Sequence, residues 1–534
     1  MRDFIKENSL TIILSLLSII GLLLFCGHYS GILIDFGREV YYPEQILQGK
    51  VLYKDLFNIY GPLSYQINAI LYFIFGAKLS TLYGMGCICS VLTVIGTYLI
   101  ANKFFSNFLS FCIGIFTITV GICTTSLFNL HFPYSWAVVY GLICFLYSLY
   151  FLLKYNNDKK DLNLIISSLL CGTAISCKYD FIVYAFVVLF FIIKSKNIKA
   201  LLSFLAVPIV SFGILFIQGL RINDLINSLI ITKTMAKSKT LTYFYQNSGI
   251  YFHPKALLSD VLIFITTIIP FGGMLLGVHK KKLWITVLSC IAFVYLIQPK
   301  TLFGFLPIAI LICGIISFKK IDSNLKILTI STLAVCTKVF WVLLIGSYGN
   351  YYVSIAIIAL LGILFTYIPK NLEKPTGIYI LLISILLLLP SLQELDKLNF
   401  SIKTEKGTIY TNSNLSLSSN MMVNYIKDFV KPTDKMVIFP EGMTINFLTN
   451  RKSDDFYNSL LPLYVEAFGE NELINHYKEN SPEYIVLTNL NMKDYYFNYI
   501  CNDYALEFCG FINENYKLNK VIDEDFKYII FKKK

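Results

Sequence analysis

The sequence predicts a polytopic α-helical membrane protein with a second, α/β domain at its C-terminus. Of its 534 residues, 56% are apolar and only 15% are charged, whereas about 25% of the residues in a soluble domain are charged. Apolar runs of roughly 16 to 22 residues follow one another as far as residue 391, each near the length that crosses a hydrocarbon core of about 30 Å. We therefore expect a transmembrane domain over 1–391 and a separate domain over 392–534.

The positions of the basic residues predict how the chain crosses the membrane, because Lys and Arg concentrate on the cytoplasmic side. Seven segments, beginning with 1–8, carry 17 Lys and Arg, while five short turns on the other side carry three. These turns lie around Lys78, His131, Lys178, Lys300 and Tyr348. The alternation requires about 13 spans, with the N-terminus cytoplasmic and the C-terminal domain extracytoplasmic. The expected spans are 9–26, 80–102, 107–126, 133–153, 162–177, 180–193, 200–219, 257–278, 283–298, 301–317, 325–346, 350–368 and 375–391.

Two large loops are expected on the outer face, over 27–79 and 220–256. The first contains an apolar run, Leu63–Phe75, of about 13 residues, which is short for a span of about 20. We interpret it as a helix on the membrane surface; a short true span is the alternative. The abundance of Ile, Lys and Asn indicates an AT-rich bacterial genome, so we expect the bacterial cytoplasmic membrane.

The sequence pattern of the C-terminal region predicts a small α/β domain. Strand-like runs at 435–439, 484–488 and 528–531 alternate with helical stretches such as 420–430 and 460–468. A region of this length can bury its own core. Its two cysteines, Cys501 and Cys509, either pair or remain free thiols.

Acidic residues are scarce before residue 392, and four of the 13 lie in a single stretch of 21 residues. These are Asp35, Glu39, Glu44 and Asp55, in the first outer loop. Carboxylates are costly beside a bilayer, so such a cluster indicates function. Asp35 and Asp55 are candidates for a general base or for metal ligands, with loop solvation as the alternative. Glu39 follows Asp35 by one helical turn and shares its face.

Basic residues near the outer surface are candidates for holding a phosphate. Arg38 and Arg221 are two of only four arginines, and a guanidinium binds phosphate in bidentate fashion; ordinary interfacial anchoring is the alternative. Lys338 lies within an apolar run, so it is expected to face a polar cavity, a phosphate or a structural partner. Lys178 and Asp180 either line the same cavity or pair with each other. Tyr60, in the IYGPL turn, and the outer His131 are further candidates.

The layout resembles the GT-C superfamily of integral membrane glycosyltransferases, nearest to the protein O-mannosyltransferase and lipid A aminoarabinose transferase families. The first span delivers Asp35 into a large outer loop, which continues through a G-x-x-x-Y-x-D element at 49–55 and a GPL turn at 61–63 to a surface helix ending in FG. A dozen or so spans and an outer domain follow. The resemblance is strong over 1–105, moderate over the remaining spans and weak beyond them.

The resemblance implies a catalytic role for Asp35 and a place for Asp55 on the acceptor or metal side. The family often has a paired acid directly after the first Asp; here that residue is Phe36, which puts a tightly bound divalent metal in doubt, and Glu39 is a conceivable substitute. The donor would be a sugar on a polyprenyl phosphate, and the acceptor a hydroxyl of a cell-envelope glycan, lipid or protein. Asp35 would take the acceptor proton in an inverting displacement, while Arg38, Arg221 or Lys338 stabilises the departing phosphate.

Two other classes of function stay open. A transporter or flippase of lipid-linked sugars would have charges distributed through its spans and often repeated halves, whereas this chain has one mid-span lysine and no internal repeat. A non-catalytic scaffold of the cell envelope is the third class. Within 439–451, Glu441 and Asn446 either touch sugar or stabilise the fold. The positive net charge belongs to the membrane part, so no nucleic-acid partner is expected.

Overall fold

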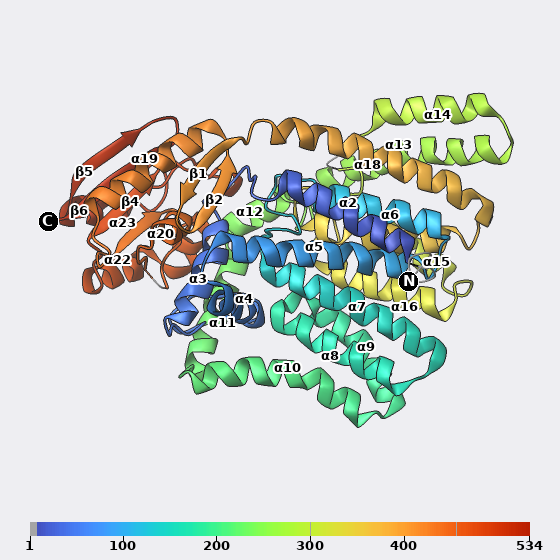
Figure 1. The fold of residues 1–534 in the computed structure, drawn as a ribbon, viewed down its shortest axis with the longest axis horizontal. Helices are drawn as coiled ribbons and strands as arrows, with labels where there is room; N and C mark the ends of the chain where they lie inside the picture. Colours follow the sequence, from blue (N-terminus) through green and yellow to red (C-terminus); the bar gives the residue numbers. More distant parts are fainter. Residues whose placement is uncertain (1–7, 299–300, 455) are drawn as a thin grey trace.

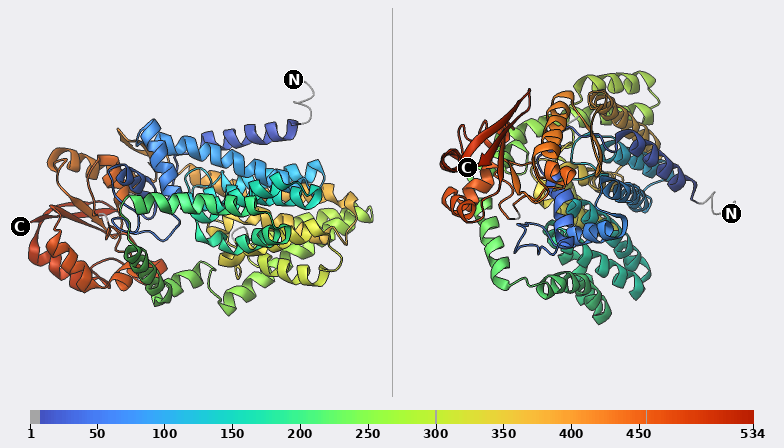
Figure 2. Two further views of the ribbon diagram at one scale, coloured as in Figure 1. Left: turned by 90° about the horizontal axis from the view of Figure 1, so that it is seen from below. Right: turned by 60° about the vertical axis from the view of Figure 1, so that its left-hand side comes forward.

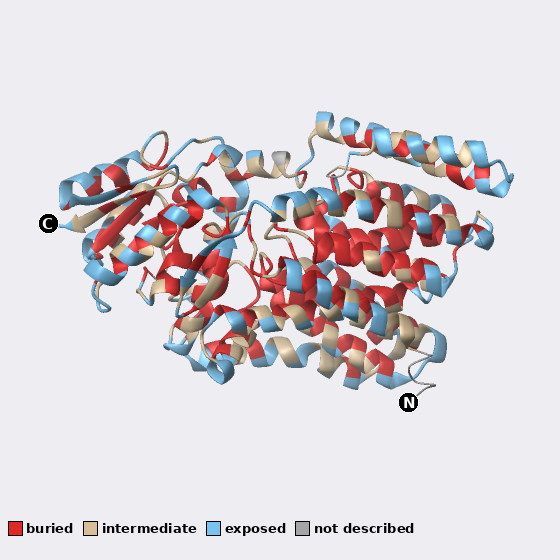
Figure 3. Cartoon of the chain, turned by 45° about the horizontal axis from the view of Figure 1, so that its top comes forward, coloured by how far each residue is buried: buried red, intermediate tan, exposed pale blue. Residues whose placement is uncertain are grey.

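The computed structural model describes residues 8–298, 301–454 and 456–534, of which 66% are helical. The predicted cytoplasmic segment 1–7 and the turn at Lys300 lie outside the described residues. Helices up to residue 395 form an elongated bundle, and the strands lie together in a domain at one end of it (Figure 1). The two further views show the same arrangement (Figure 2), and buried residues run through the interior of both parts (Figure 3).

Each of the thirteen apolar ranges predicted as spans overlaps one α-helix of the described chain. These are α2 (Ser9–Phe25), α5 (Leu79–Ala101), α6 (Asn107–Gly121), α7 (Trp136–Asp158), α8 (Asp161–Cys177), α9 (Ile182–Ser195), α10 (Ile198–Ile217), α13 (Pro254–His279), α14 (Leu283–Leu296), α15 (Leu306–Ser317), α16 (Ser323–Val335), α17 (Val353–Leu364) and α18 (Glu373–Leu395). Among the described residues, five helical segments are long and apolar enough to cross a membrane, namely α5, α7, α10, α13 and the segment 370–395 that contains α18. The number of spans and their orientation stay predictions.

The helix expected over 325–346 is shorter than predicted. It ends at Val335 and continues only as a 3₁₀ turn, Cys336–Val339. The turn carries Lys338 to within 3.8 Å of the carboxylate of Asp180. Lys338 therefore has a charged partner that its apolar sequence surroundings do not reveal.

The two outer loops contain helices of their own. The first holds α3 (Phe36–Leu47) and α4 (Leu63–Phe75), the apolar run interpreted as a surface helix; the second holds α11 (Ile222–Lys237) and α12 (Lys239–Asn247). Figure 1 shows α3, α4 and α11 at the end of the bundle that faces the C-terminal domain. Both loops therefore lie beside that domain.

The C-terminal domain is built around a four-stranded mixed sheet of order β3-β4-β6-β5. Its strands are β3 (Met436–Phe439), β4 (Tyr484–Thr488), β5 (Tyr516–Asp523) and β6 (Lys527–Lys533). β3 and β4 are parallel and wholly buried, as expected for strands covered by helices on both faces. The other elements are the hairpin β1 (Phe400–Thr404) and β2 (Gly407–Thr411) and the helices α19 (Ser413–Phe429), α20 (Met443–Thr449), α21 (Pro462–Phe468), α22 (Glu470–Glu479) and α23 (Leu506–Asn515).

A disulfide joins Cys501 to Cys509 in this domain. Of the two alternatives left open by the sequence, the structure therefore has the paired form. The bridge lies immediately before and within α23, far along the chain from the candidate site residues.

The C-terminal domain is docked on the first outer loop through backbone contacts. The N–H of Tyr29 donates to the carbonyl of Tyr410 at 3.0 Å, and the N–H of Tyr410 donates to the carbonyl of Gly27 at 2.8 Å. Helix α20 packs on α3, where a Cβ at Gly37 would lie 2.5 Å from the backbone nitrogen of Thr444. Only glycine allows this close approach.

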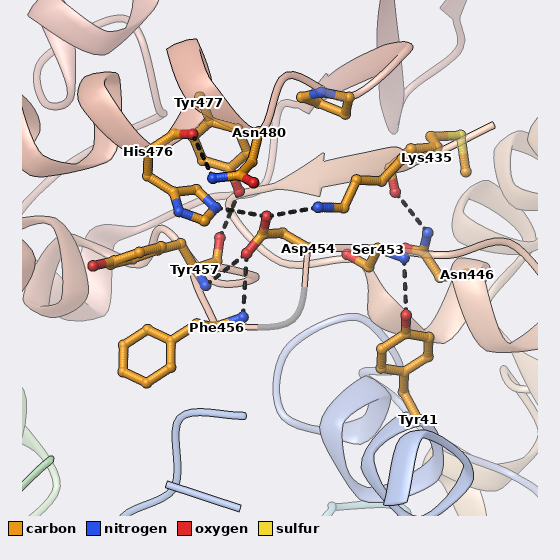
Figure 4. A network of polar contacts seen from close by, with 12 residues as sticks. Tyr41, Lys435, Asn446, Ser453, Asp454, Phe456, Tyr457, His476, Tyr477 and Asn480 are labelled. Atoms are coloured by element: carbon orange, nitrogen blue, oxygen red, sulfur yellow. Dashed lines mark hydrogen bonds and ion pairs between the residues drawn. The ribbon is translucent and has the colours of Figure 1, made fainter. Parts of the chain in front are cut away.

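A buried network holds the part of the domain that meets α3 (Figure 4). The carboxylate of Asp454 lies 3.1 Å from Nζ of Lys435 and 2.8 Å from Nε2 of His476, and it accepts two backbone N–H bonds. Burial opposes ionisation, but these partners outweigh it and lower the pKa of Asp454 to about 2. Next to it, the N–H of Ser453 donates to the hydroxyl of Tyr41 on α3 at 2.9 Å.

Candidate active site

Asp35 and Arg38 form the centre of the site at the start of α3. Asp35 is the N-cap residue, so its side chain lies beside the first helical turn, where Arg38 follows three residues later. Nη2 of Arg38 pairs with Oδ1 of Asp35, and Nη1 donates to the hydroxyl of Tyr464 on α21 at 3.0 Å. The Arg38 side chain is buried, whereas that of Asp35 is 21% exposed. A carboxylate oriented by a guanidinium and still open to solvent is suited to act as a base.

Two further carboxylates flank this pair. Glu39 is buried and accepts from the hydroxyl of Tyr65 and the N–H of Trp136, both at 3.0 Å. Glu441, between β3 and α20, accepts the N–H of Asp35 on Oε2 at 3.0 Å. Burial raises the pKa of Glu39 to about 7 and that of Glu441 to about 8. The pKa of Asp35 is also raised, because burial outweighs the lowering effect of the Arg38 guanidinium.

An aromatic wall, Tyr60, Tyr134 and Tyr348, extends from Arg38 across the site. The guanidinium lies 5.8 Å from the ring centre of Tyr134, whose hydroxyl accepts from that of Tyr60 at 2.7 Å. The ring of Tyr348 lies 6.2 Å from that of Tyr134. The sequence singled out Tyr60, but not the other two members.

Beyond the aromatic wall lies a lysine pair, Lys178 and Lys338, on either side of Asp180. Their Nζ atoms lie 3.4 and 3.8 Å from Oδ2 of Asp180, and 5.1 and 3.9 Å from the ring centre of Tyr348. Lys178 is buried, and its Nζ has no hydrogen-bond acceptor among the described residues. Burial and then Lys338 lower the pKa of Lys178 to about 8. Two ammonium groups facing one carboxylate leave a positive charge that favours an anion.

An apolar groove of about 930 Å³ is lined by residues that follow Asp180 and precede Lys338 in the sequence. It runs between α9 and α16, and its lining includes Val183, three residues after Asp180, and Thr337, directly before Lys338. Phe186 and Phe190 on α9 line it and are exposed. The groove can hold a long hydrocarbon whose polar end lies at the lysine pair.

Comparisons with known proteins give structural likenesses but no sequence match. Neither a protein-family model nor a curated protein matches this chain. The structure of ArnT from Cupriavidus metallidurans bound to undecaprenyl phosphate has 11% identity and a TM-score of 0.44, over 99% of this chain and 98% of that chain. The Archaeoglobus fulgidus oligosaccharyltransferase tethered to an acceptor peptide has 13% identity and a TM-score of 0.48, over 98% of this chain and 74% of that chain.

These likenesses are to two membrane-enzyme structures, at identities of 11% and 13%. Because the TM-scores lie below 0.5, the function proposed below rests on the residues of the site itself.

Three residues predicted for the site lie elsewhere. Asp55 accepts the N–H of Val51 at 2.8 Å and so closes a local turn. Arg221 is exposed at the start of α11, where its N–H donates to Asp224. His131 is buried against Tyr29, and burial lowers its pKa to about 3. No hydrogen bond or ion pair among the described residues links any of the three to Asp35.

The residues at the site do not suit a divalent metal. The sequence made Asp35 and Asp55 candidate metal ligands, but the guanidinium of Arg38 already binds Asp35, and Asp55 closes its own turn. A fixed cation on the carboxylate disfavours a second one. No group of three metal-binding side chains occurs among the described residues.

Glu441 is a site residue to which the sequence did not assign a single role. It follows β3 in the segment FPEGMTINFLTNR, where the sequence left sugar contact and fold stabilisation open. The signal available in the sequence for Glu441 was its place as a single acidic residue between a buried strand and an apolar helix. Asn446, from the same segment, donates to the carbonyl of Met436 within the C-terminal domain at 2.8 Å.

Proposed function

We propose that the protein is a membrane glycosyltransferase that moves a sugar from a polyprenyl-phosphate donor to an acceptor hydroxyl of the cell envelope, with inversion. One observation carries the proposal: a partly exposed carboxylate, fixed by Arg38, lies at one end of an aromatic wall, and the lysine pair, of which Lys178 is buried and Lys338 is partly exposed, lies at the other. Base and anion site are thus separated by a surface on which a sugar ring can stack.

The reaction assigns a role to each end of the site. Oδ of Asp35 takes the proton of the acceptor hydroxyl as its oxygen bonds to the anomeric carbon. The bond from that carbon to the phosphate oxygen breaks, and the electron pair leaves with the polyprenyl phosphate. The proton on Asp35 then passes to water. The charge that grows on the phosphate is stabilised by Lys178 and Lys338.

Arg38 has a different role from the phosphate binding expected of it. Both of its terminal nitrogens bind side chains of the protein, Asp35 and Tyr464. We propose that it orients Asp35 and keeps the carboxylate ionised, while the lysine pair binds the donor phosphate. The lipid chain would lie in the groove between α9 and α16, with its phosphate at the membrane surface.

The test is a transfer assay with the purified protein in nanodiscs and a panel of polyprenyl-phosphate sugars. Release of free polyprenyl phosphate, dependent on added acceptor and unchanged by EDTA, is the expected result. Movement of intact donor between the leaflets of a vesicle, without release, would instead establish a transporter. If the protein shows neither release nor movement with any donor, the result would favour a scaffold.

A further inference from the structure

Glu441 brings the C-terminal domain into direct contact with the backbone of Asp35. It lies beyond the carboxyl end of β3, the position at which open α/β sheets place functional side chains. Its side chain is wholly buried, Oε2 accepts the N–H of Asp35 at 3.0 Å, and Oε1 has no partner among the described residues. Burial of a carboxyl group costs free energy when one of its oxygen atoms has no hydrogen-bond partner, so this position indicates a functional role.

We propose that Glu441 is a positioning residue, through which docking of the C-terminal domain sets the conformation of Asp35. This role rests on the proposed function, because it concerns the same base. It makes the C-terminal domain part of the active site rather than an attached module.

The backbone of Asp35 needs such a contact. Its φ is 65°, in the left-handed region that few residues other than glycine occupy. The bond to Glu441 holds the N–H, and Arg38 holds the side chain, so that both ends of the residue are fixed. Loss of the first bond would let the residue relax and turn its carboxylate away from the acceptor.

The surroundings of Glu441 favour its neutral form. The charged and titratable groups that face it are Asp35, Arg38, Tyr42, Tyr464 and Tyr495. Burial and the neighbouring Asp35 carboxylate outweigh the attraction of Arg38 and raise the pKa of Glu441 to about 8. A neutral Glu441 accepts the N–H bond without adding a second negative charge beside the base, whereas ionisation above pH 8 adds that charge.

The neighbouring contacts connect this bond to docking of the domain. Tyr464 accepts from Arg38, and the hydroxyl of Thr444 on α20 donates to the carbonyl of Ile32. Glu441, Thr444 and Tyr464 therefore make three contacts that join the domain to residues 32–38 of the first outer loop. A shift of the domain would move all three together.

The experiment compares Glu441→Gln and Glu441→Ala with wild type in the donor-release assay. Glu470→Ala is the matched control, since Glu470 accepts the N–H of Phe508 at 2.9 Å inside the domain. We expect Glu441→Ala to lower kcat by about 30-fold or more, as a misplaced base does, with the KM for donor within threefold. Glu441→Gln, which keeps an acceptor oxygen, should retain kcat within about threefold. It should also lose the decline in activity that we expect of wild type above pH 8.

Each other outcome has a distinct meaning. Wild-type kcat in Glu441→Ala, or an equal loss in the Gln and Ala variants, overturns the positioning role. If Glu441→Ala fails to fold, Glu441→Gln provides the test. The proposal is overturned if the activity of Glu441→Gln declines above pH 8 as much as that of wild type. A wild-type protein inactive on every donor contradicts the proposed function first, and the role of Glu441 with it.

Discussion

Arg38 on α3 donates from Nη1 to the hydroxyl of Tyr464 on α21 at 3.0 Å, while Nη2 of the same guanidinium binds Asp35. One planar group thus joins a residue of the C-terminal domain to the proposed base. The arrangement needs two donors in a fixed plane, which arginine has and lysine lacks.

Replacement of Arg38 by Lys should therefore lower kcat/KM by about 10- to 100-fold, because an ammonium cannot hold both partners in this geometry. Arg221→Lys is the control and should stay within about twofold, since Arg221 is exposed. Steady-state donor-release kinetics measure both. Full activity in Arg38→Lys would show that its positive charge suffices.

The lysine pair should determine donor affinity. Lys178→Met and Lys338→Met each remove a cation from the proposed phosphate site, and we expect the KM for donor to rise about tenfold or more in each variant. Lys78→Met removes an exposed lysine and should change nothing. Unaltered KM in both of the first two variants would mean that the phosphate binds elsewhere.

Gly37 should be essential for docking of the C-terminal domain. In Gly37→Ala the new methyl group meets the backbone of Thr444, and overpacking of this kind costs about 1 to 3 kcal/mol. We expect a lower thermal midpoint and loss of transfer. Gly31→Ala, where a Cβ meets nothing within 4 Å, should behave as wild type in the same thermal scan. Equal midpoints for the two variants would rule out tight docking at Gly37.

Glu39 should make stability depend on pH. Its pKa is raised to about 7, so the folded protein retains a proton that the unfolded chain releases above its ordinary value. The stabilisation is complete at low pH and is lost as pH rises through 7. We expect the thermal midpoint to fall by a few degrees between pH 5 and 8, and Glu39→Gln to reduce that fall. An identical fall in wild type and variant would contradict the assignment.

The sequence predicts those residues of the site that lie close to one another along the chain. Asp35, Arg38 and Glu39 lie at the start of one helix, and the scarcity of acids and of arginines made them stand out. Asp55 and Arg221 satisfied the same criteria of charge and position. In the structure, however, Asp55 accepts the N–H of Val51, and the backbone N–H of Arg221 donates to Asp224. Composition alone does not distinguish a residue that closes a turn from one that faces a substrate.

Contacts between distant parts of the chain account for what the sequence missed. Glu441 follows Asp35 by 406 residues, and nothing in either segment indicates the other. The apolar runs predicted the positions of the helices, because a helix that crosses a membrane needs a continuous run of about 20 apolar residues. Strand β5 was missed because it is an edge strand whose residues are mostly exposed and half of them polar.

The central claim is that Asp35 is the base of a sugar transfer, and the most direct test compares Asp35→Asn with Asp55→Asn. Both changes remove one carboxylate from the same loop, and only Asp35 lies in the site described above. The measurement is acceptor-dependent release of polyprenyl phosphate by purified proteins of equal thermal midpoint. We predict loss of release by at least about 100-fold in Asp35→Asn and activity within about threefold of wild type in Asp55→Asn. Equal activity of wild type and Asp35→Asn would contradict the account.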